Sequence, residues 1–146
     1  MKLPALSRQN ILPRERTKMK INSIHHIALL TDDYETSKKF YTDVLGFKIV
    51  KETFREDRNS YKLDLSINGK YQVELFSFPE FRERGSYPEA KGLRHLALSV
   101  SNLEETYREL KDKGVRVEEI RTDSLTNKRF LFFYDPNDQP LELYEE

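Results

Sequence analysis

An internal repeat constrains this chain of 146 residues more than any other feature of its sequence. The run His26-Ile-Ala-Leu near the front recurs as His95-Leu-Ala-Leu, and Val-Glu74-Leu-Phe recurs as Leu-Glu142-Leu-Tyr. Glu74 follows His26 at almost the same spacing at which Glu142 follows His95. A period of about 68 residues predicts two copies of one structural unit.

Each copy predicts the same order of elements: one strand, one helix and three further strands. Segments rich in apolar, β-branched and aromatic residues predict strands in the first copy at 24–31, 47–54, 60–67 and 71–78. The corresponding segments of the second copy are 93–100, 115–120, 130–134 and 140–144. Asn68-Gly69 predicts a tight hairpin turn between two of these strands.

A helix is predicted after the first strand of each copy. Asp32 and Ser101 are each followed three residues later by a glutamate, which is the pattern of a capping box. Gly46 and Gly114 lie where a residue in the left-handed conformation ends a helix. The length of the helix therefore repeats along with the strands.

The predicted organisation is a flexible basic arm, 1–20, followed by a single domain, 21–146. The domain contains two βαβββ modules, 21–78 and 92–146, joined by a Pro- and Gly-containing linker, 79–91. One helix cannot cover both faces of a four-stranded sheet, so we expect the two sheets to associate and share a cleft. The predicted fold class is α+β, with paired βαβββ modules that form a metal-containing cleft.

Composition limits the chemistry and the partners of the protein. The chain has no cysteine, so any metal must be held by nitrogen and oxygen ligands. The 25 basic and 25 acidic residues cancel, which predicts no general attraction to nucleic acid or to an anionic membrane. No apolar run approaches the roughly 20 residues that span a bilayer, and no signal peptide is evident. We expect a cytoplasmic protein whose partner is a small-molecule substrate.

Each histidine is expected to lie beside the glutamate of its own copy. Side chains alternate along a strand, so Glu74, between two apolar neighbours that face the core, turns to the opposite face. Glu142 repeats this arrangement. If the first and fourth strands of a module are neighbours, His26 meets Glu74 and His95 meets Glu142.

Two imidazoles and two carboxylates, from His26, Glu74, His95 and Glu142, make a ligand set that suits a divalent cation. A lone histidine in a strand is more often packed than bound to a metal, but four such residues at equivalent places favour a metal centre. His25 is adjacent and would replace His26 if the strand register shifted by one residue. The second copy has an arginine at the equivalent place, which favours His26.

Two basic residues are candidates for contact with an anionic substrate. Lys62 shares a predicted strand face with Asp64, and Arg129 shares its face with Leu131 and Phe133.

These motifs resemble those of the vicinal oxygen chelate superfamily, which includes glyoxalase I, extradiol dioxygenases, methylmalonyl-CoA epimerase, and the fosfomycin and bleomycin resistance proteins. The resemblance covers 22–146. It rests on the two histidine runs, on Phe40-Tyr-Thr-Asp-Val-Leu-Gly-Phe, and on Phe133-Tyr-Asp-Pro-Asn-Asp with Leu141-Glu-Leu-Tyr. It implies paired βαβββ modules around a metal and is strongest to the small bacterial glyoxalase I-like proteins.

The complete set of two histidines and two glutamates looks most like glyoxalase I. The resemblance implies an enzyme similar to lactoylglutathione lyase: a metal-dependent lyase or isomerase that acts, through an enediolate, on a small molecule with vicinal oxygens. Glu142 is the implied base, with Glu74 as its pseudo-symmetric alternative. Zinc or nickel is the expected metal, and manganese, cobalt or iron also fits these ligands. Lys51 stands where glyoxalase I has an arginine that meets glutathione, so the thiol is left open.

Two other functions remain open from the sequence. One is a binding protein that sequesters a small molecule such as an antibiotic, and the other is a metal-dependent dioxygenase of the same superfamily. We expect a homodimer, with the metal site formed either within one chain or across the two.

Overall fold

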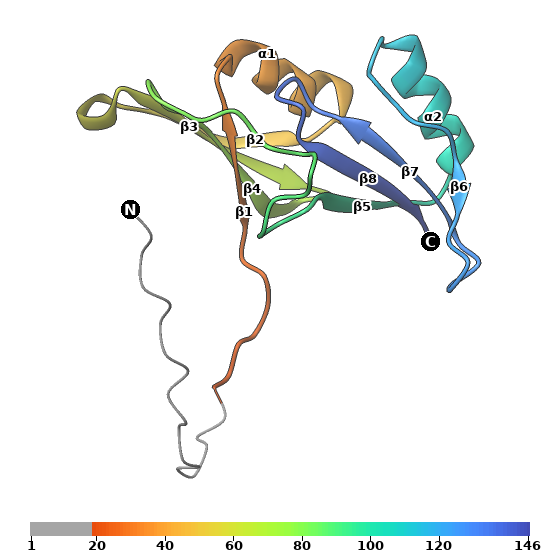
Figure 1. Ribbon diagram of the computed structural model, residues 1–146. Helices are drawn as coiled ribbons and strands as arrows, with labels where there is room; N and C mark the ends of the chain where they lie inside the picture. Colours follow the sequence, from red (N-terminus) through yellow and green to blue (C-terminus); the bar gives the residue numbers. More distant parts are fainter. Residues whose placement is uncertain (1–18) are drawn as a thin grey trace.

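The computed structural model describes residues 19–146 (Figure 1). The predicted arm, 1–20, lies almost wholly outside the described residues and stays a prediction. Within 19–146 the chain forms two four-stranded sheets, each with one α-helix, as the repeat predicts. None of the helices in this part of the chain is long and apolar enough to cross a membrane.

The first copy forms a sheet with the strand order β1-β4-β3-β2. Its elements are β1 (Ile27–Thr31), α1 (Tyr34–Lys39) with a π-helical turn (Phe40–Val44), β2 (Lys48–Arg55) with a 3₁₀ turn (Glu56–Arg58), β3 (Ser60–Ile67) and β4 (Lys70–Ser77). Strands β1 and β4 pair in parallel, so the first and fourth strands are neighbours. Asn68 and Gly69 have φ angles of 49° and 80°, which confirms the predicted tight turn.

The second copy repeats this topology with the strand order β5-β8-β7-β6. Its elements are β5 (Leu96–Val100), α2 (Leu103–Asp112), β6 (Arg121–Thr122), β7 (Arg129–Tyr134) and β8 (Pro140–Glu145). Strands β5 and β8 pair in parallel, as β1 and β4 do. In both copies the first strand begins directly after the histidine, at Ile27 and Leu96, and is shorter than predicted.

The strand predicted at 115–120 is wrong, because β6 contains only Arg121–Thr122. Residues of the predicted segment still run beside β7: Val117 pairs with Phe133 as an isolated bridge, and the Glu118 N–H donates to the Phe132 carbonyl at 2.8 Å. These contacts are too few and too irregular to form a continuous ladder. The outer edge of this sheet is therefore weaker than its counterpart in the first copy.

Both helices begin one residue later than the capping boxes predict. Asp33, not Asp32, caps α1, and Asn102, not Ser101, caps α2. In each case the side-chain oxygen accepts the backbone N–H three residues on, at 3.1 Å. Aspartate, asparagine and serine cap helices about equally well, so residue type does not choose between the neighbouring candidates. The residue that caps each helix lies outside the helical conformation, with φ −122° and ψ 92° at Asp33 and φ −129° and ψ 90° at Asn102.

The two helices lie on the same side of the two sheets (Figure 1). The sheet faces that they cover carry one apolar core shared by both copies. Its fully buried side chains include Tyr41, Leu63, Leu65, Leu75, Leu103, Leu131, Phe133 and Leu141. The opposite side of each sheet, which we call its open face, is therefore where side chains with other roles can gather.

Buried polar contacts join the two copies at the turn between β7 and β8. The Tyr41 hydroxyl donates to the Asp135 carboxylate at 2.6 Å, and the Asn137 amide donates to the Ser37 hydroxyl at 2.9 Å. Burial raises the pKa of Asp135, although hydrogen bonds from Tyr41 and from backbone N–H groups oppose it. Burial and the charge of Asp135 raise the pKa of Tyr41 well above its usual value. This junction holds the α1 region of one copy against the other.

Candidate metal centre

His26 and Glu74 form the first expected pair. Ala28 lies opposite Glu74 in the register of β1 and β4, and His26 directly precedes β1 on the same face as Ala28. The His26 Nε2 lies 3.2 Å from Glu74 Oε2. Glu74 is only 8% exposed, so this carboxylate lies on the open face without facing bulk water.

Three groups surround the carboxylate of Glu74. Its Oε1 accepts hydrogen bonds from the Tyr71 hydroxyl and from the Lys62 ammonium group, the latter at 2.9 Å, while Oε2 faces His26. Burial alone would raise the pKa of Glu74, but the bonds from Tyr71 and Lys62 and the nearby His26 outweigh it and lower the pKa. Glu74 is therefore held as an anion in a fixed orientation.

Lys62 is engaged on two sides. Its ammonium group lies 2.7 Å from Asp64 as well as 2.9 Å from Glu74, and hydrogen bonds to these carboxylates raise its pKa. The carboxylates of Asp64 and Glu74 thus neutralise the positive charge of Lys62, which was expected to bind an anionic substrate. The position of Lys62 fits a role in holding Glu74 better than a role in binding substrate.

His95 and Glu142 form the second expected pair. Ala97 lies opposite Glu142 in the register of β5 and β8, as Ala28 lies opposite Glu74. The His95 Nε2 lies 2.8 Å from Glu142 Oε2. Phe132, opposite Glu142 on β7, packs edge-on against the imidazole with 5.0 Å between ring centroids. Aromatic rings thus stand where the first pair has Asp64.

His26, rather than its neighbour His25, is the imidazole that faces Glu74. The Nδ1 atoms of His25 and His26 lie 2.8 Å apart, so His25 can fix the ring of His26 from the far side. In the second pair, the His95 Nδ1 is buried and has no hydrogen-bond partner within residues 19–146. The two pairs are alike in their backbone positions but differ in their surroundings.

The two pairs do not meet within one chain. No three His, Asp or Glu side chains of residues 19–146 come together in a group that could hold a metal ion. Of the two arrangements left open by the sequence, assembly within one chain is therefore not seen in this part of the protein. Each chain presents two separate histidine–glutamate pairs, one on each open face, and we call each pair a half-site.

A cavity of about 750 Å³ borders the second pair. It lies between β1, linker residues 81–85 and the turn 135–139, and His95 is the one expected ligand in its lining. The carboxylates of Glu74 and Glu142 are not among its lining residues. This space is next to one half-site and is not itself the meeting point of the four ligands.

The model of the glyoxalase/bleomycin resistance protein/dioxygenase superfamily matches residues 23–143. The chain belongs to this superfamily. Its predicted fold class, two βαβββ copies in the glyoxalase/bleomycin resistance fold, is thereby confirmed.

Close relatives cover nearly the whole chain. The uncharacterized protein YwkD of Bacillus subtilis is 59% identical over 88% of this chain and 100% of its own length. The uncharacterized protein YaeR of Escherichia coli is 52% identical over 86% of this chain and 98% of its own length. A crystal structure of a glyoxalase family protein from Enterococcus faecalis superposes with a TM-score of 0.80 at 42% identity, covering 87% of this chain and all of that one.

More distant superfamily members carry out different reactions. They include metallothiol transferase FosB of Staphylococcus saprophyticus (31% identical over 85% of this chain and 77% of FosB), the putative ring-cleaving dioxygenase MhqE of Bacillus subtilis (26% over 88% and 43%) and lactoylglutathione lyase of Schizosaccharomyces pombe (23% over 89% and 49%). Membership of the superfamily thus defines a set of metal-dependent reactions and does not select one.

The ligand atoms of each pair fit the geometry of a shared cation. Two ligand atoms that each lie about 2.1 Å from one metal, at right angles to each other, are about 3 Å apart. The nitrogen–oxygen distances are 3.2 Å in the first pair and 2.8 Å in the second. The imidazole and carboxylate of each pair therefore fit a divalent metal that prefers nitrogen and oxygen ligands, and the chain has no cysteine to offer instead.

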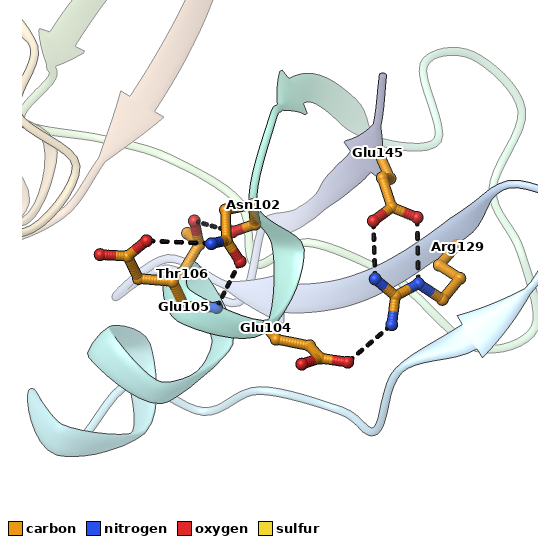
Figure 2. A network of polar contacts seen from close by, with 6 residues as sticks. All are labelled: Asn102, Glu104, Glu105, Thr106, Arg129 and Glu145. Carbon is orange, nitrogen blue, oxygen red and sulfur yellow. Dashed lines mark hydrogen bonds and ion pairs between the residues drawn. The ribbon is translucent and has the colours of Figure 1, made fainter.

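Arg129 lies away from both half-sites. It shares its strand face with the buried Leu131 and Phe133, which is the face covered by α2, whereas Glu142 is on the open face. Its guanidinium binds Glu145 with two hydrogen bonds, at 3.0 and 2.7 Å, and Glu104 of α2 at 2.8 Å (Figure 2). We therefore remove Arg129 from the candidate substrate-binding residues.

Sequence reasoning missed Tyr71. Strict alternation would place it on the core face with Val73, but the register between β3 and β4 shifts after Leu65, and this irregularity lets its hydroxyl reach Glu74. No pattern in the sequence marks that bulge. Asp64 was predicted to share a face with Lys62, and the two do form an ion pair.

Proposed function

We propose that this protein is a metal-dependent lyase or isomerase of the glyoxalase I type, which acts on a small molecule with two adjacent oxygen atoms. One observation supports the proposal above the others. The same imidazole–carboxylate pair is built twice, at equivalent register positions of two sheets, with nitrogen–oxygen distances of 3.2 and 2.8 Å.

A second copy of the chain would complete the centre. Within residues 19–146 the open faces carry no helix, the side chain of His26 is 38% exposed, and Leu30, four residues further along the chain in β1, is 55% exposed. Two copies related by a two-fold axis would place the first module of each opposite the second module of the other. Each of two identical sites would then receive His26 and Glu74 from one copy, and His95 and Glu142 from the other.

The four ligands leave room for substrate. Two neutral imidazoles and two carboxylates balance the charge of a divalent ion, and zinc or nickel is the first expectation, with manganese, cobalt and iron as alternatives. A bound metal would supply Lewis acidity that polarises the two substrate oxygens and acidifies the neighbouring C–H bond.

Glu142 is the better candidate for the base that moves the proton. Glu74 is already bonded to Tyr71, Lys62 and His26, whereas the hydrogen bonds and ion pairs of residues 19–146 give Glu142 a single polar partner, His95. A carboxylate with fewer partners can turn its oxygen toward a substrate carbon at lower cost. Glu142 would accept the proton from one carbon and return it to the adjacent one.

The test begins with metal analysis of the purified protein, followed by assays of hemithioacetal isomerisation with several thiols, glutathione among them. Glu142→Gln should lower kcat by about 10²–10⁴-fold while the protein still folds. Glu145→Gln is the matched control, since Glu145 is on the same strand but faces Arg129 on the helix-covered side. Full activity of Glu142→Gln would eliminate the proposed role of that residue.

The same assays separate the alternatives. A bound metal without turnover of any hemithioacetal favours a sequestering protein. Oxygen consumption that depends on iron favours a dioxygenase. A monomeric protein without bound metal would eliminate the proposed centre altogether.

A further inference from the structure

Arg55 is a second basic residue on the open face of the first sheet, and no role has yet been assigned to it. It is the last residue of β2. Its guanidinium lies over the rings of Phe76 and Phe78, 4.8 and 5.4 Å from their centroids, and donates to the Ser60 hydroxyl at 2.8 Å. Aromatic stacking and one hydrogen bond therefore fix the side chain over the sheet.

Arg55 and Glu74 occupy the same face. Phe76 follows Glu74 by two residues on β4, so their side chains point to the same side of the sheet, and the Arg55 guanidinium covers Phe76 on that side. Two residues along a strand correspond to about 7 Å. This spacing separates Glu74 from Phe76, and the Arg55 guanidinium lies over the ring of Phe76, so a molecule bound at the first half-site can extend along this face toward Arg55.

The guanidinium of Arg55, unlike the charged groups of Lys62 and Arg129, has no carboxylate beside it within residues 19–146. Lys62 and Arg129 each contact two carboxylates, but no carboxylate of the described chain, 19–146, lies within ion-pair distance of Arg55. Its Nε is buried and has no hydrogen-bond partner among the same residues. A charged group that is partly buried without a counter-ion is costly, so an anion bound to the terminal N–H groups of the guanidinium would stabilise it.

We propose that Arg55 binds the anionic group of the substrate. The substrate class would be a small molecule that carries two adjacent oxygens at one end and a carboxylate or a phosphonate-type group at the other. The part of this proposal that concerns the two adjacent oxygens at the metal rests on the proposed function. The anion site rests only on Arg55 and the residues around it.

The anion site can be tested without turnover. The backbone N–H signals of Ser60 and Phe76, which adjoin Arg55, report anion binding in every variant. In the unaltered protein, the Nε–H signal of Arg55 in ¹H–¹⁵N spectra would also be followed while methylphosphonate or acetate is added at constant ionic strength. We expect this signal to shift for at least one of the two anions, and the comparison identifies which anion class is preferred. Arg55→Met should weaken the binding by about 10- to 100-fold.

Arg58→Met is the matched control, because it removes the same charge three residues away from an exposed side chain that only approaches Asp57, at 3.9 Å. It should bind the anions as the unaltered protein does. Arg55→Lys keeps the charge but not the planar fork of donors and should bind with intermediate affinity. If the Nε–H signal of Arg55 is unmoved by both anions, its role is structural and the proposal is refuted.

Turnover provides a second arm that distinguishes the two proposals. Methylglyoxal hemithioacetals of mercaptoacetate (anionic) and of 2-mercaptoethanol (neutral) would be compared. Arg55→Met should lose about 10- to 100-fold in kcat/KM for the anionic substrate and nothing for the neutral one. Anion binding without any turnover would support Arg55 and refute the lyase proposal. If Arg55→Met turns over both substrates as the unaltered protein does, the lyase proposal is supported and the anion site is refuted.

Discussion

Replacing Tyr41 with phenylalanine removes one hydroxyl from the junction between the two modules. Tyr41 is 0% exposed and Asp135 is 4% exposed, and the two oxygens are 2.6 Å apart. A hydrogen bond to a charged group contributes about 1.5–3 kcal/mol. We therefore expect Tyr41→Phe to lower the free energy of unfolding by about 1.5–3 kcal/mol at pH 7, which is large against the roughly 5–15 kcal/mol typical of a domain.

The loss of stability in Tyr41→Phe should depend on pH, because the hydrogen bond from Tyr41 is strongest when the carboxyl group of Asp135 is ionised. Burial raises the pKa of Asp135 above 3.8, and the Tyr41 hydroxyl opposes that rise. Removing the hydroxyl raises this pKa further. A carboxyl group whose pKa is raised on folding makes the native state less stable as the pH rises through that pKa. The deficit of Tyr41→Phe should therefore be small near pH 3 and grow toward neutrality.

Urea unfolding followed by circular dichroism at several pH values measures this deficit. Tyr107→Phe is the control, since the Tyr107 hydroxyl donates to Glu119 at 3.0 Å in an exposed position, and it should cost less than about 1 kcal/mol. Equal losses for the two substitutions would show that the junction bond is not special. A Tyr41→Phe deficit that stays constant from pH 3 to 7 would refute the role of the ionised carboxylate.

Three further perturbations test other parts of the structure. Hydrogen bonds, chiefly from Lys38, lower the pKa of Glu52 below 4.5, so Glu52 contributes stability above that pH and loses it as the pH falls. Glu52→Gln should cost about 0.2–1 kcal/mol at pH 7 and nothing below about pH 3 in urea unfolding, because this ion pair is partly exposed. Phe133→Ala, in the shared core, should cost about 3–5 kcal/mol by the same measurement, and a loss under about 1 kcal/mol would contradict its burial. Arg129→Met should cost at most about 1 kcal/mol, vanishing in about 1 M salt, and leave turnover unchanged; lost turnover would return Arg129 to the site.

Local signals predicted the elements of this fold well. Gly46 and Gly114 have φ angles of 76° and 73° just past their helices, and Asn68-Gly69 forms the turn that its residues favour. Such features depend on the conformations that a few adjacent residues can adopt. The errors are of three kinds: the first strand of each copy is shorter than predicted, each helix begins one residue late, and 115–120 lacks a continuous ladder.

Residue partners were predicted less reliably than elements. Alternation correctly put Lys62 on the face of Asp64, but the sequence did not reveal that Asp64 and Glu74 would both bind its ammonium group. Alternation also placed Arg129 on the face of Leu131 and Phe133, yet which of the two faces α2 would cover was decided by packing. Arg55 is not among the candidates from the sequence, because its aromatic partners, Phe76 and Phe78, are more than 20 residues away along the chain.

The sequence by itself determined the two-fold repeat, the class of fold and the pairing of each histidine with its own glutamate. It could do so because strand alternation and a shared register are properties of one module, and they are written within about 68 residues. The tertiary structure alone decided that the two pairs stay apart within one chain, since that depends on how the modules pack at the Tyr41–Asp135 junction. Contacts between modules arise from the shapes of two folded surfaces, and no local period in the chain encodes them.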